Sequence, residues 1–299
     1  MASTLCIIWI TPQPKNVNWV LSIDSMGFDM VALLREGYES SRGFKIHFLE
    51  WGSKGEEMLL LHSMMMDAHS FDSFSSTMQR DFRLLGLDLL GHGESDKPTE
   101  SVSLEEHVEL LRDVTLKRGF SKFILVGHSI GGILGIAWAA KHPEEITRLV
   151  LVDIAPKDPT TPQVRTTVPV PESFRTLEEV RSYLRQRYPK FTEEALENRM
   201  RYGVEKVQEG HYRLKVSLQT REMLWKSNID VDLWPYVSRV KIPVLLVKGK
   251  ESQTVSSASV ELMRKMLSSF ALVEIDGATH MVPQDAPREF EKTVRSFIK

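Results

Sequence analysis

From residue 44 onward, short apolar segments alternate with helical patterns. The segment at 44–51 has a mostly period-two apolar pattern, whereas the run at 58–61 is continuously apolar, as a strand buried on both faces should be. Further strands are expected at 82–90, 123–126 and 149–154, and helices at 104–118 and 130–141. Strands and helices that alternate in this way favour a mostly parallel sheet with helices on both faces, here of about eight strands.

The alternation breaks after residue 154 and resumes near residue 243. Five prolines punctuate the start of the break, at Pro156, Pro159, Pro162, Pro169 and Pro171. Two charged helices follow, at 176–188 and 192–207, and the resumed pattern gives strands at 243–247 and 271–275 and helices at 256–268 and 286–298. We therefore expect an α/β core of residues 31–154 and 239–299, into which residues 155–238 insert as a helical cap.

Residues 1–30 do not follow the core pattern and are expected to form an N-terminal extension. Their apolar run at 5–10 has no basic residue before it and is followed by Pro12 and Pro14, unlike a signal peptide. No window reaches the roughly 18 apolar residues of a membrane span. Cys6 is the only cysteine, so no intramolecular disulfide can form. We expect a cytoplasmic protein.

The composition excludes several classes of function. The net charge of −2 gives no basic footprint for nucleic acid or for an anionic membrane. The nucleotide-binding and metal-binding motifs G-x-x-x-x-G-K-[ST], G-x-G-x-x-G, H-E-x-x-H and paired cysteines are absent. We expect no cofactor, no metal and a small-molecule substrate, and we leave the oligomeric state open.

The strongest local motif is Gly-His-Ser-Ile-Gly-Gly at 127–132, directly after an apolar strand and before a small apolar helix. A nucleophile on so sharp a turn needs small neighbours, and the turn lifts the Ser129 hydroxyl above the sheet. A glycine-rich turn that only packs is the plain alternative. The strand–turn–helix context favours a nucleophilic serine.

Two histidines fall at sheet edges where chemistry is expected. His280 follows the last strand and precedes the last helix, so it lies at the same edge as Ser129 and can serve as its base. His62 ends the strand at 58–61 and is expected to shape a turn. In that turn the backbone N–H of Met64, beside that of Ile130, donates to an oxyanion.

Several segments together resemble the α/β-hydrolase family, in particular its cap-bearing esterase-like and lactonase-like members. The resemblance runs from about residue 30 to the C-terminus. It rests on LLLHS (59–63), DLLGHGESDKP (88–98), GHSIGG (127–132), LVDIAP (151–156), DLWPYVSRVKIPVLLVKG (232–249) and GATHMVPQDAP (277–287). In that family the stretch at 88–98 is a structural rim loop, so His92 is assigned no chemistry.

Two positions depart from the family pattern. The family has glycine where this chain has Ser63, which implies backbone strain there if the position needs a positive φ. The family's acid usually stands three residues beyond the glycine that ends the next-to-last strand, and that position here is Ser252. Because a hydroxyl carries no charge and Glu251 is one residue early, the resemblance implies Asp153 as the acid and Ser252 as its helper.

The remaining site residues are expected to line an apolar pocket or to support the oxyanion turn. Met65, Phe71 and Trp225 are the candidates for the pocket, although methionines at such spacing are as often plain core. Asp67 and His69 are expected to cap a helix that begins near Ser70.

These residues indicate a serine hydrolase that cleaves carboxylic ester-like bonds of small to medium substrates through an acyl-enzyme. Lactonase, thioesterase, carbon–carbon bond hydrolase and cofactor-free perhydrolase chemistry on the same fold are alternatives. A hydrolase-fold receptor that only binds its ligand is the alternative from another class. Epoxide-hydrolase and dehalogenase chemistry is disfavoured, because it resembles family branches with aspartate in place of Ser129.

Overall fold

The structure is a computed structural model, and it describes residues 8–9, 17–21, 33–158, 170–207 and 210–299. One sheet runs through the molecule in the order β1-β2-β3-β4-β6-β5-β7-β8-β11-β12. Its strands are β1 (Ile8–Trp9), β2 (Val17–Leu21), β3 (Leu33–Ser41), β4 (Phe44–Trp51), β5 (Glu56–Leu61), β6 (Phe82–Leu87), β7 (Phe123–His128), β8 (Ile146–Val152), β11 (Val244–Gly249) and β12 (Phe270–Ile275).

The six strands from β6 to β12 in the sheet order pair in parallel, whereas β1 to β4 are antiparallel additions at one edge. The α/β-hydrolase fold with a mostly parallel core is therefore confirmed. The seven strands expected by residue range correspond to β4, β5, β6, β7, β8, β11 and β12. The strand β3, which the sequence pattern did not indicate, makes eight, and the short strands β1 and β2 of the N-terminal segment extend the sheet to ten. Most of the segment at 1–30 lies outside the described residues.

Helices cover both faces of the sheet because each parallel strand offers apolar side chains to both sides. In β5, Leu59 and Leu61 join the core cluster under one set of helices, and Met58 and Leu60 join the cluster on the opposite face. The first face is covered by α2 (Leu104–Lys117), α3 (Ile130–Lys141) and α8 (Ser257–Met266), and the second by α1 (Asp72–Met78), α9 (Val282–Asp285) and α10 (Pro287–Ile298).

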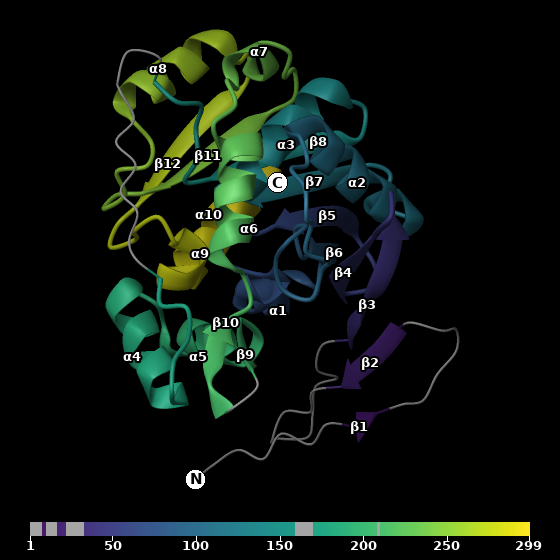
Figure 1. The fold of residues 1–299 in the computed structure, drawn as a ribbon. Helices are drawn as coiled ribbons and strands as arrows, with labels where there is room; N and C mark the ends of the chain where they lie inside the picture. Colours follow the sequence, from purple (N-terminus) through teal and green to yellow (C-terminus); the bar gives the residue numbers. More distant parts are fainter. Residues whose placement is uncertain (1–7, 10–16, 22–32, 159–169, 208–209) are drawn as a thin grey trace.

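Between β8 and β11 the chain leaves the sheet, within the segment proposed as the cap. Its elements are α4 (Leu177–Arg187), α5 (Glu193–Tyr202), β9 (Val204–Lys206), β10 (Tyr212–Leu214), α6 (Leu218–Leu224), the π-helical turn η3 (Trp225–Ile229) and α7 (Trp234–Val237). Figure 1 shows α4, α5, β9 and β10 grouped beyond the sheet, with α6 leading back to the core.

The apolar side chains of this segment divide into two groups. Most of those in 174–216 form a cluster of their own, which Met65 of the core completes, whereas Phe191 clusters with Met66 and Met281 of the core. Leu224, Leu233 and Val237 instead pack into the main core beside α3. The expected helix at 192–207 ends at Tyr202, because the chain turns at Gly203 into the β9–β10 hairpin.

Candidate active site

Ser129 occupies the turn between β7 and α3, in a backbone conformation that residues other than glycine rarely adopt. Its φ is 54° and its ψ is −117°. A Cβ atom on Gly131 would lie 2.2 Å from the carbonyl oxygen of Leu61, and one on Gly127 would lie 2.4 Å from that of Gly131. Glycine is therefore required on both sides of the turn, which holds a half-exposed serine at the carboxyl end of β7.

Asp153 follows β8, the strand beside β7, and its carboxylate contacts His280. Oδ2 of Asp153 lies 2.8 Å from Nδ1 of His280, and Oδ1 accepts a hydrogen bond of 2.9 Å from the backbone N–H of Gly249. The Ser252 hydroxyl donates to Oδ2 at 2.5 Å. Asp153 is fully buried. Burial alone would raise its pKa, but hydrogen bonding to His280, the charge of His280 and the bond from Ser252 together lower the pKa of this carboxyl.

The contact between Asp153 and His280 fixes which nitrogen of the imidazole is free. With Nδ1–H donating to the carboxylate, Nε2 is left unprotonated as a base. The His280 side chain is 32% exposed, which leaves it accessible from the site. Thr254 also reaches this histidine, since its hydroxyl lies 3.2 Å from Nδ1. The sequence pattern alone did not single out Thr254.

His128 connects the nucleophile turn to the loop that carries His280. Its Nε2 atom donates a 2.8 Å hydrogen bond to the backbone oxygen of His280, and the two ring centroids are 5.2 Å apart. Burial, reinforced by the charge of His280, lowers the pKa of His128 to about 3. A neutral His128 therefore acts as a tether. The sequence did not reveal it, although its place beside Ser129 was a signal.

His62 shapes the turn after β5, as expected. Its Nδ1–H donates to the backbone oxygen of Ser63 at 2.8 Å, and its Nε2 accepts a 2.9 Å bond from the backbone N–H of Leu89. Burial lowers the pKa of His62, so the ring is neutral and joins the turn to the rim loop. The expected strain at Ser63 is wrong: the positive φ, of 69°, belongs to Met65 instead.

The two proposed oxyanion donors flank the nucleophile turn. Met64 lies in the turn after β5, and Ile130 is the first residue of α3. Within the described ranges, no hydrogen bond engages the backbone N–H of Met64 or of Ile130. Both donors are therefore free to bind an oxyanion.

The structure places the three pocket candidates differently. Met65 is 6% exposed and packs in the cluster of apolar residues from 174–216, called the α4–α5 cluster below. Trp225 is half-buried in η3, with its Nε1–H donating to Asp230 at 3.2 Å. Phe71 is fully buried in the core, edge-to-face against Phe74, because the short helical turn at 68–71 directs it under the sheet. We therefore withdraw Phe71 as a pocket residue.

The expected helix caps were also assigned wrongly. Asp67 makes no side-chain capping bond and instead pairs with Arg199 of α5 at 3.3 Å, with both residues buried. His69 pairs with Asp72 at 3.0 Å and stacks on Tyr202 of α5. These two residues thus hold α5 against the core.

Glu251, the alternative acid, points away from the catalytic group. Its carboxylate is exposed and lies 3.0 Å from Nζ of Lys190. By contrast, Ser252 is directed at Asp153. The geometry therefore supports Asp153 over Glu251 as the partner of the base.

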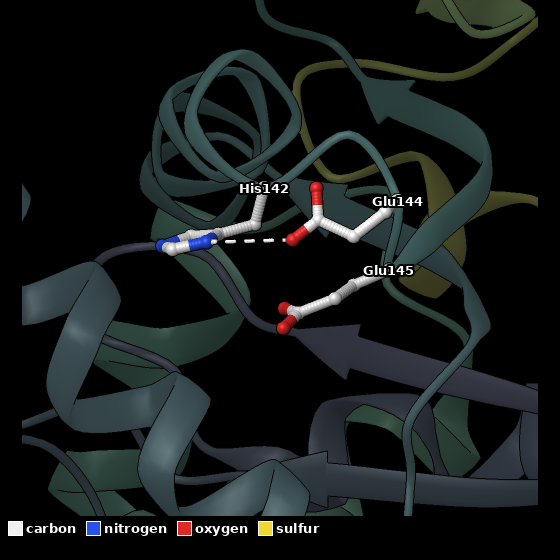
Figure 2. Close-up of side chains that lie close together, drawn as sticks. All are labelled: His142, Glu144 and Glu145. Carbon is white, nitrogen blue, oxygen red and sulfur yellow. Dashed lines mark ion pairs between the residues drawn. The ribbon is translucent and has the colours of Figure 1, made fainter.

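One cluster outside this site has the side chains of a metal centre. His142, Glu144 and Glu145 bring one ligand atom each to within 4.8 Å of one another. Figure 2 shows these three side chains close together. Both oxygens of Glu145 are engaged, one by Arg112 at 2.5 Å and the other by the Trp138 indole at 2.9 Å. A cation would have to displace a guanidinium already bound, so these contacts favour an ion-pair network that joins α3 to α2.

Comparison with known proteins gives the family. The chain matches the alpha/beta hydrolase fold over residues 58–287. It is 28% identical over 249 residues to 2-(acetamidomethylene)succinate hydrolase of Mesorhizobium japonicum, covering 82% of this chain and 88% of that one. It is 24% identical to epoxide hydrolase 3 of Xenopus tropicalis, covering 86% of this chain and 75% of that one.

Solved structures agree on the fold. The crystal structure of E-2-(acetamidomethylene)succinate hydrolase superposes with a TM-score of 0.77 at 24% identity, covering 88% of this chain and 98% of that one. The thioesterase domain from the curacin biosynthetic pathway gives a TM-score of 0.75 at 20% identity, covering 88% and 99%. In the described part of the chain, no helix is both long and apolar enough to cross a membrane. The protein belongs to the alpha/beta hydrolase fold family, whose members compared above are hydrolases.

Proposed function

We propose that this protein is a serine hydrolase that cleaves carboxylic ester-like bonds of small to medium substrates through an acyl-enzyme. The observation that carries the proposal is the 2.8 Å contact between Asp153 and His280 at the sheet edge that also bears the strained Ser129 turn. Nucleophile, base and acid come from the ends of three strands or their following loops, in the chain order Ser, Asp, His.

In the proposed mechanism, Nε2 of His280 accepts the Ser129 proton as the hydroxyl oxygen attacks the carbonyl carbon. The backbone N–H groups of Ile130 and Met64 hold the oxyanion, and loss of one such donor typically costs about 10²–10³ in rate. The imidazolium then protonates the leaving alcohol as the tetrahedral intermediate collapses. Water then attacks the acyl carbon as His280 takes its proton. When this second tetrahedral intermediate collapses, the imidazolium returns the proton to Oγ of Ser129, and the carboxylic acid leaves.

The carboxylate of Asp153 orients the imidazole and stabilises its charged form. Its lowered pKa keeps it ionised at neutral pH, and burial leaves no water to screen it. The backbone N–H of Gly249 bonds Oδ1, the oxygen that His280 leaves free, and the Ser252 hydroxyl donates to Oδ2, which it shares with His280. This arrangement supports Asp153 as the acid and Ser252 as its helper.

The related reactions of this fold differ in the type of bond that is cleaved, so a set of substrates can distinguish them. One relative is named for an acetamido-substituted succinate and another for epoxides, so experiment must determine which type of bond this protein cleaves. Epoxide hydrolysis is disfavoured, since it resembles branches with aspartate at the position of Ser129. A panel of p-nitrophenyl esters, lactones, thioesters and N-acyl substrates, run with wild type and Ser129→Ala, tests the proposal. Ester turnover that needs Ser129 supports it, and turnover confined to another bond type refutes it.

The expected preference for small substrates rests on the segment proposed as the cap. Met65 of the proposed oxyanion turn belongs to the same buried cluster as Val180 and Leu184 of α4, so this segment packs onto the turn. A covered site admits a small ester more easily than a bulky lipid. Short acyl esters should therefore be cleaved faster than emulsified long-chain triglyceride, and the reverse order would contradict the covered site.

We also propose a cytoplasmic location. The single cysteine, Cys6, supports it, because proteins of oxidising compartments commonly use paired cysteines. Fractionation of cells that express the tagged chain tests this, and recovery with secreted or membrane fractions would contradict it.

A further inference from the structure

Arg221 of α6 is a nearly buried cation with little to balance it. Its side chain is 12% exposed, and its ion-pair partner in the described part of the chain, the carboxylate of Glu222, is 3.7 Å away and 44% exposed. Nε of Arg221 is buried and has no hydrogen-bond partner among the described residues. A guanidinium carries five N–H donors, and leaving them unsatisfied away from water is unfavourable. The arrangement suits a ligand that brings oxygen acceptors.

Tyr183 of α4 presents a second unsatisfied donor in the same neighbourhood. Its hydroxyl is buried and, within the described ranges, has no hydrogen-bond partner. Burial raises the pKa of Tyr183, and the positive charges of Arg187, Arg199 and Arg221 oppose that rise. Three guanidinium groups thus lie within electrostatic range of one neutral phenol.

Among the described residues, Arg199 is the one of these cations that pairs with a buried carboxylate. Arg199 is 4% exposed and pairs with Asp67 at 3.3 Å, although its Nε has no hydrogen-bond partner in the described part of the chain. Asp67 therefore offsets Arg199. Within the part of the chain that the structure describes, Arg221 has only the half-exposed Glu222 as a counter-charge.

Both donors come from the segment between β8 and β11, which contacts the core at the proposed oxyanion turn and at the rim loop. Tyr183 packs against the cluster that contains Met65, and Met64 contacts the same cluster. Thr220, the neighbour of Arg221, packs so closely on Gly91 of the rim loop that a Cβ there would lie 2.4 Å from its methyl group. The buried Tyr183 hydroxyl therefore belongs to a residue that packs on the same cluster as the proposed oxyanion turn.

A carboxylate fits these donors better than the alternatives. A neutral carbonyl would leave the charge of Arg221 uncompensated, and a phosphate dianion would be repelled by Asp67 and would need more donors than one phenol and one guanidinium edge supply. A carboxylate has one negative charge and two acceptor oxygens, which match Nε–H of Arg221 and the hydroxyl of Tyr183.

We propose that the substrate carries a carboxylate remote from the scissile bond, held by Arg221 and Tyr183. This inference rests on the proposed serine hydrolase function and narrows its substrate class to acidic esters. The reaction is unchanged: the remote carboxylate only orients the acyl group on Ser129.

A matched pair of substrates tests the inference. p-Nitrophenyl hydrogen succinate and p-nitrophenyl methyl succinate differ only in the remote carboxylate. Wild type should give a higher kcat/KM for the acidic ester. Arg221→Gln should lower the ratio of acidic to neutral kcat/KM by about 10- to 100-fold, and Tyr183→Phe by about 3- to 10-fold, mainly through KM. Arg213→Gln, which removes a 55% exposed arginine from β10, should leave the ratio at its wild-type value.

The outcomes separate the two proposals. An equal or lower wild-type rate for the acidic ester, or a ratio that neither Arg221→Gln nor Tyr183→Phe reduces, overturns the carboxylate site while Ser129-dependent turnover still supports the hydrolase. If neither ester is cleaved, calorimetry on Ser129→Ala decides: monomethyl succinate should bind at least about tenfold more tightly than dimethyl succinate, and Arg221→Gln should abolish the difference. Should Arg221→Gln fail to fold, the isosteric Tyr183→Phe carries the same test.

Discussion

The Asp153 carboxylate and the His280 imidazole are 127 residues apart in the chain and 2.8 Å apart in the fold. Each follows a parallel strand, β8 and β12, and the carboxyl ends of parallel strands meet at one edge of a sheet. The positive φ of 48° at Asp153 turns the chain out of β8 at this point. The contact therefore follows from topology as well as from side-chain chemistry.

Replacing the acid while keeping its shape should disable the enzyme. Asp153→Asn should lower kcat by up to about 10⁴, because the amide favours the wrong imidazole tautomer and cannot stabilise the imidazolium. Glu251→Gln is the matched control, and its kcat should stay near the wild-type value, since this carboxylate contacts Lys190 instead. Steady-state kinetics on p-nitrophenyl acetate make the comparison. If Glu251→Gln were slow and Asp153→Asn active, the acid would not be Asp153 but would lie after the next-to-last strand, as is usual in the family.

Removing the helper should have a smaller effect. Ser252→Ala deletes one hydrogen bond to the buried Asp153 carboxylate, so kcat should fall by about tenfold. The same bond helps to lower the pKa of Asp153, so in its absence that pKa rises and activity should be lost at a higher pH on the acid side. A pH–rate profile measures both effects, and an unchanged kcat and acid limb would contradict the role.

The glycine on the helix side of the nucleophile turn should not tolerate a methyl group. Gly131→Ala places Cβ 2.2 Å from the backbone oxygen of Leu61, and backbone cannot move aside cheaply. We expect a loss of at least about 3 kcal/mol of unfolding free energy in urea. Gly135→Ala, on the same helix, first meets side-chain atoms of Leu125 and Leu149, which can rotate, and should cost less. Equal losses for the two variants would argue against a tight turn.

A buried ion pair predicts how stability changes with pH. Burial lowers the pKa of His47, but hydrogen bonds to Asp88 and Glu36 outweigh this effect and raise the pKa from 6.5 to about 9. A raised folded-state pKa stabilises the fold fully below pH 6.5, and this contribution is lost as pH rises through 9. Relative to His47→Gln, wild type should therefore lose up to about 3 kcal/mol of unfolding free energy over this range.

Urea unfolding at a series of pH values measures the effect on His47. His211→Gln, at a half-exposed histidine, is the control and should follow the wild-type profile. Wild type and His47→Gln profiles that run parallel from pH 6 to 9.5 would exclude a charged His47 in the folded protein.

Much of the core could be predicted because its signals are local. The strand Phe44–Trp51 and the helix Ile130–Lys141 have the bounds that their apolar patterns indicate. The resemblance to the family implied Asp153 as the acid, because Ser252 stands in the usual acid position, and the contact of Asp153 with His280 agrees with that prediction. The contacts of His62 with Ser63 and Leu89 likewise follow from its place at a strand end.

What the sequence missed depends on contacts between distant residues. Asp67 faces Arg199, which is 132 residues away, so the capping that its neighbours suggested was overridden by a buried ion pair. Met65, and not Ser63, takes the positive φ, because the α4–α5 cluster holds its side chain. The short strands β9 and β10 pair with each other in a hairpin. Each has three residues, which is too short for an alternating apolar pattern to be recognised in the sequence.

Covalent labelling of Ser129 tests the central claim most directly. A serine-directed fluorophosphonate should modify the wild-type protein once, and peptide mass spectrometry should place the adduct on Ser129. His280→Ala should label far more slowly, because the hydroxyl loses its base, and Ser129→Ala should not label while remaining folded by circular dichroism. A labelled Ser129→Ala, or a wild-type protein that neither labels nor turns over p-nitrophenyl acetate, would contradict the assignment of Ser129 as a nucleophile.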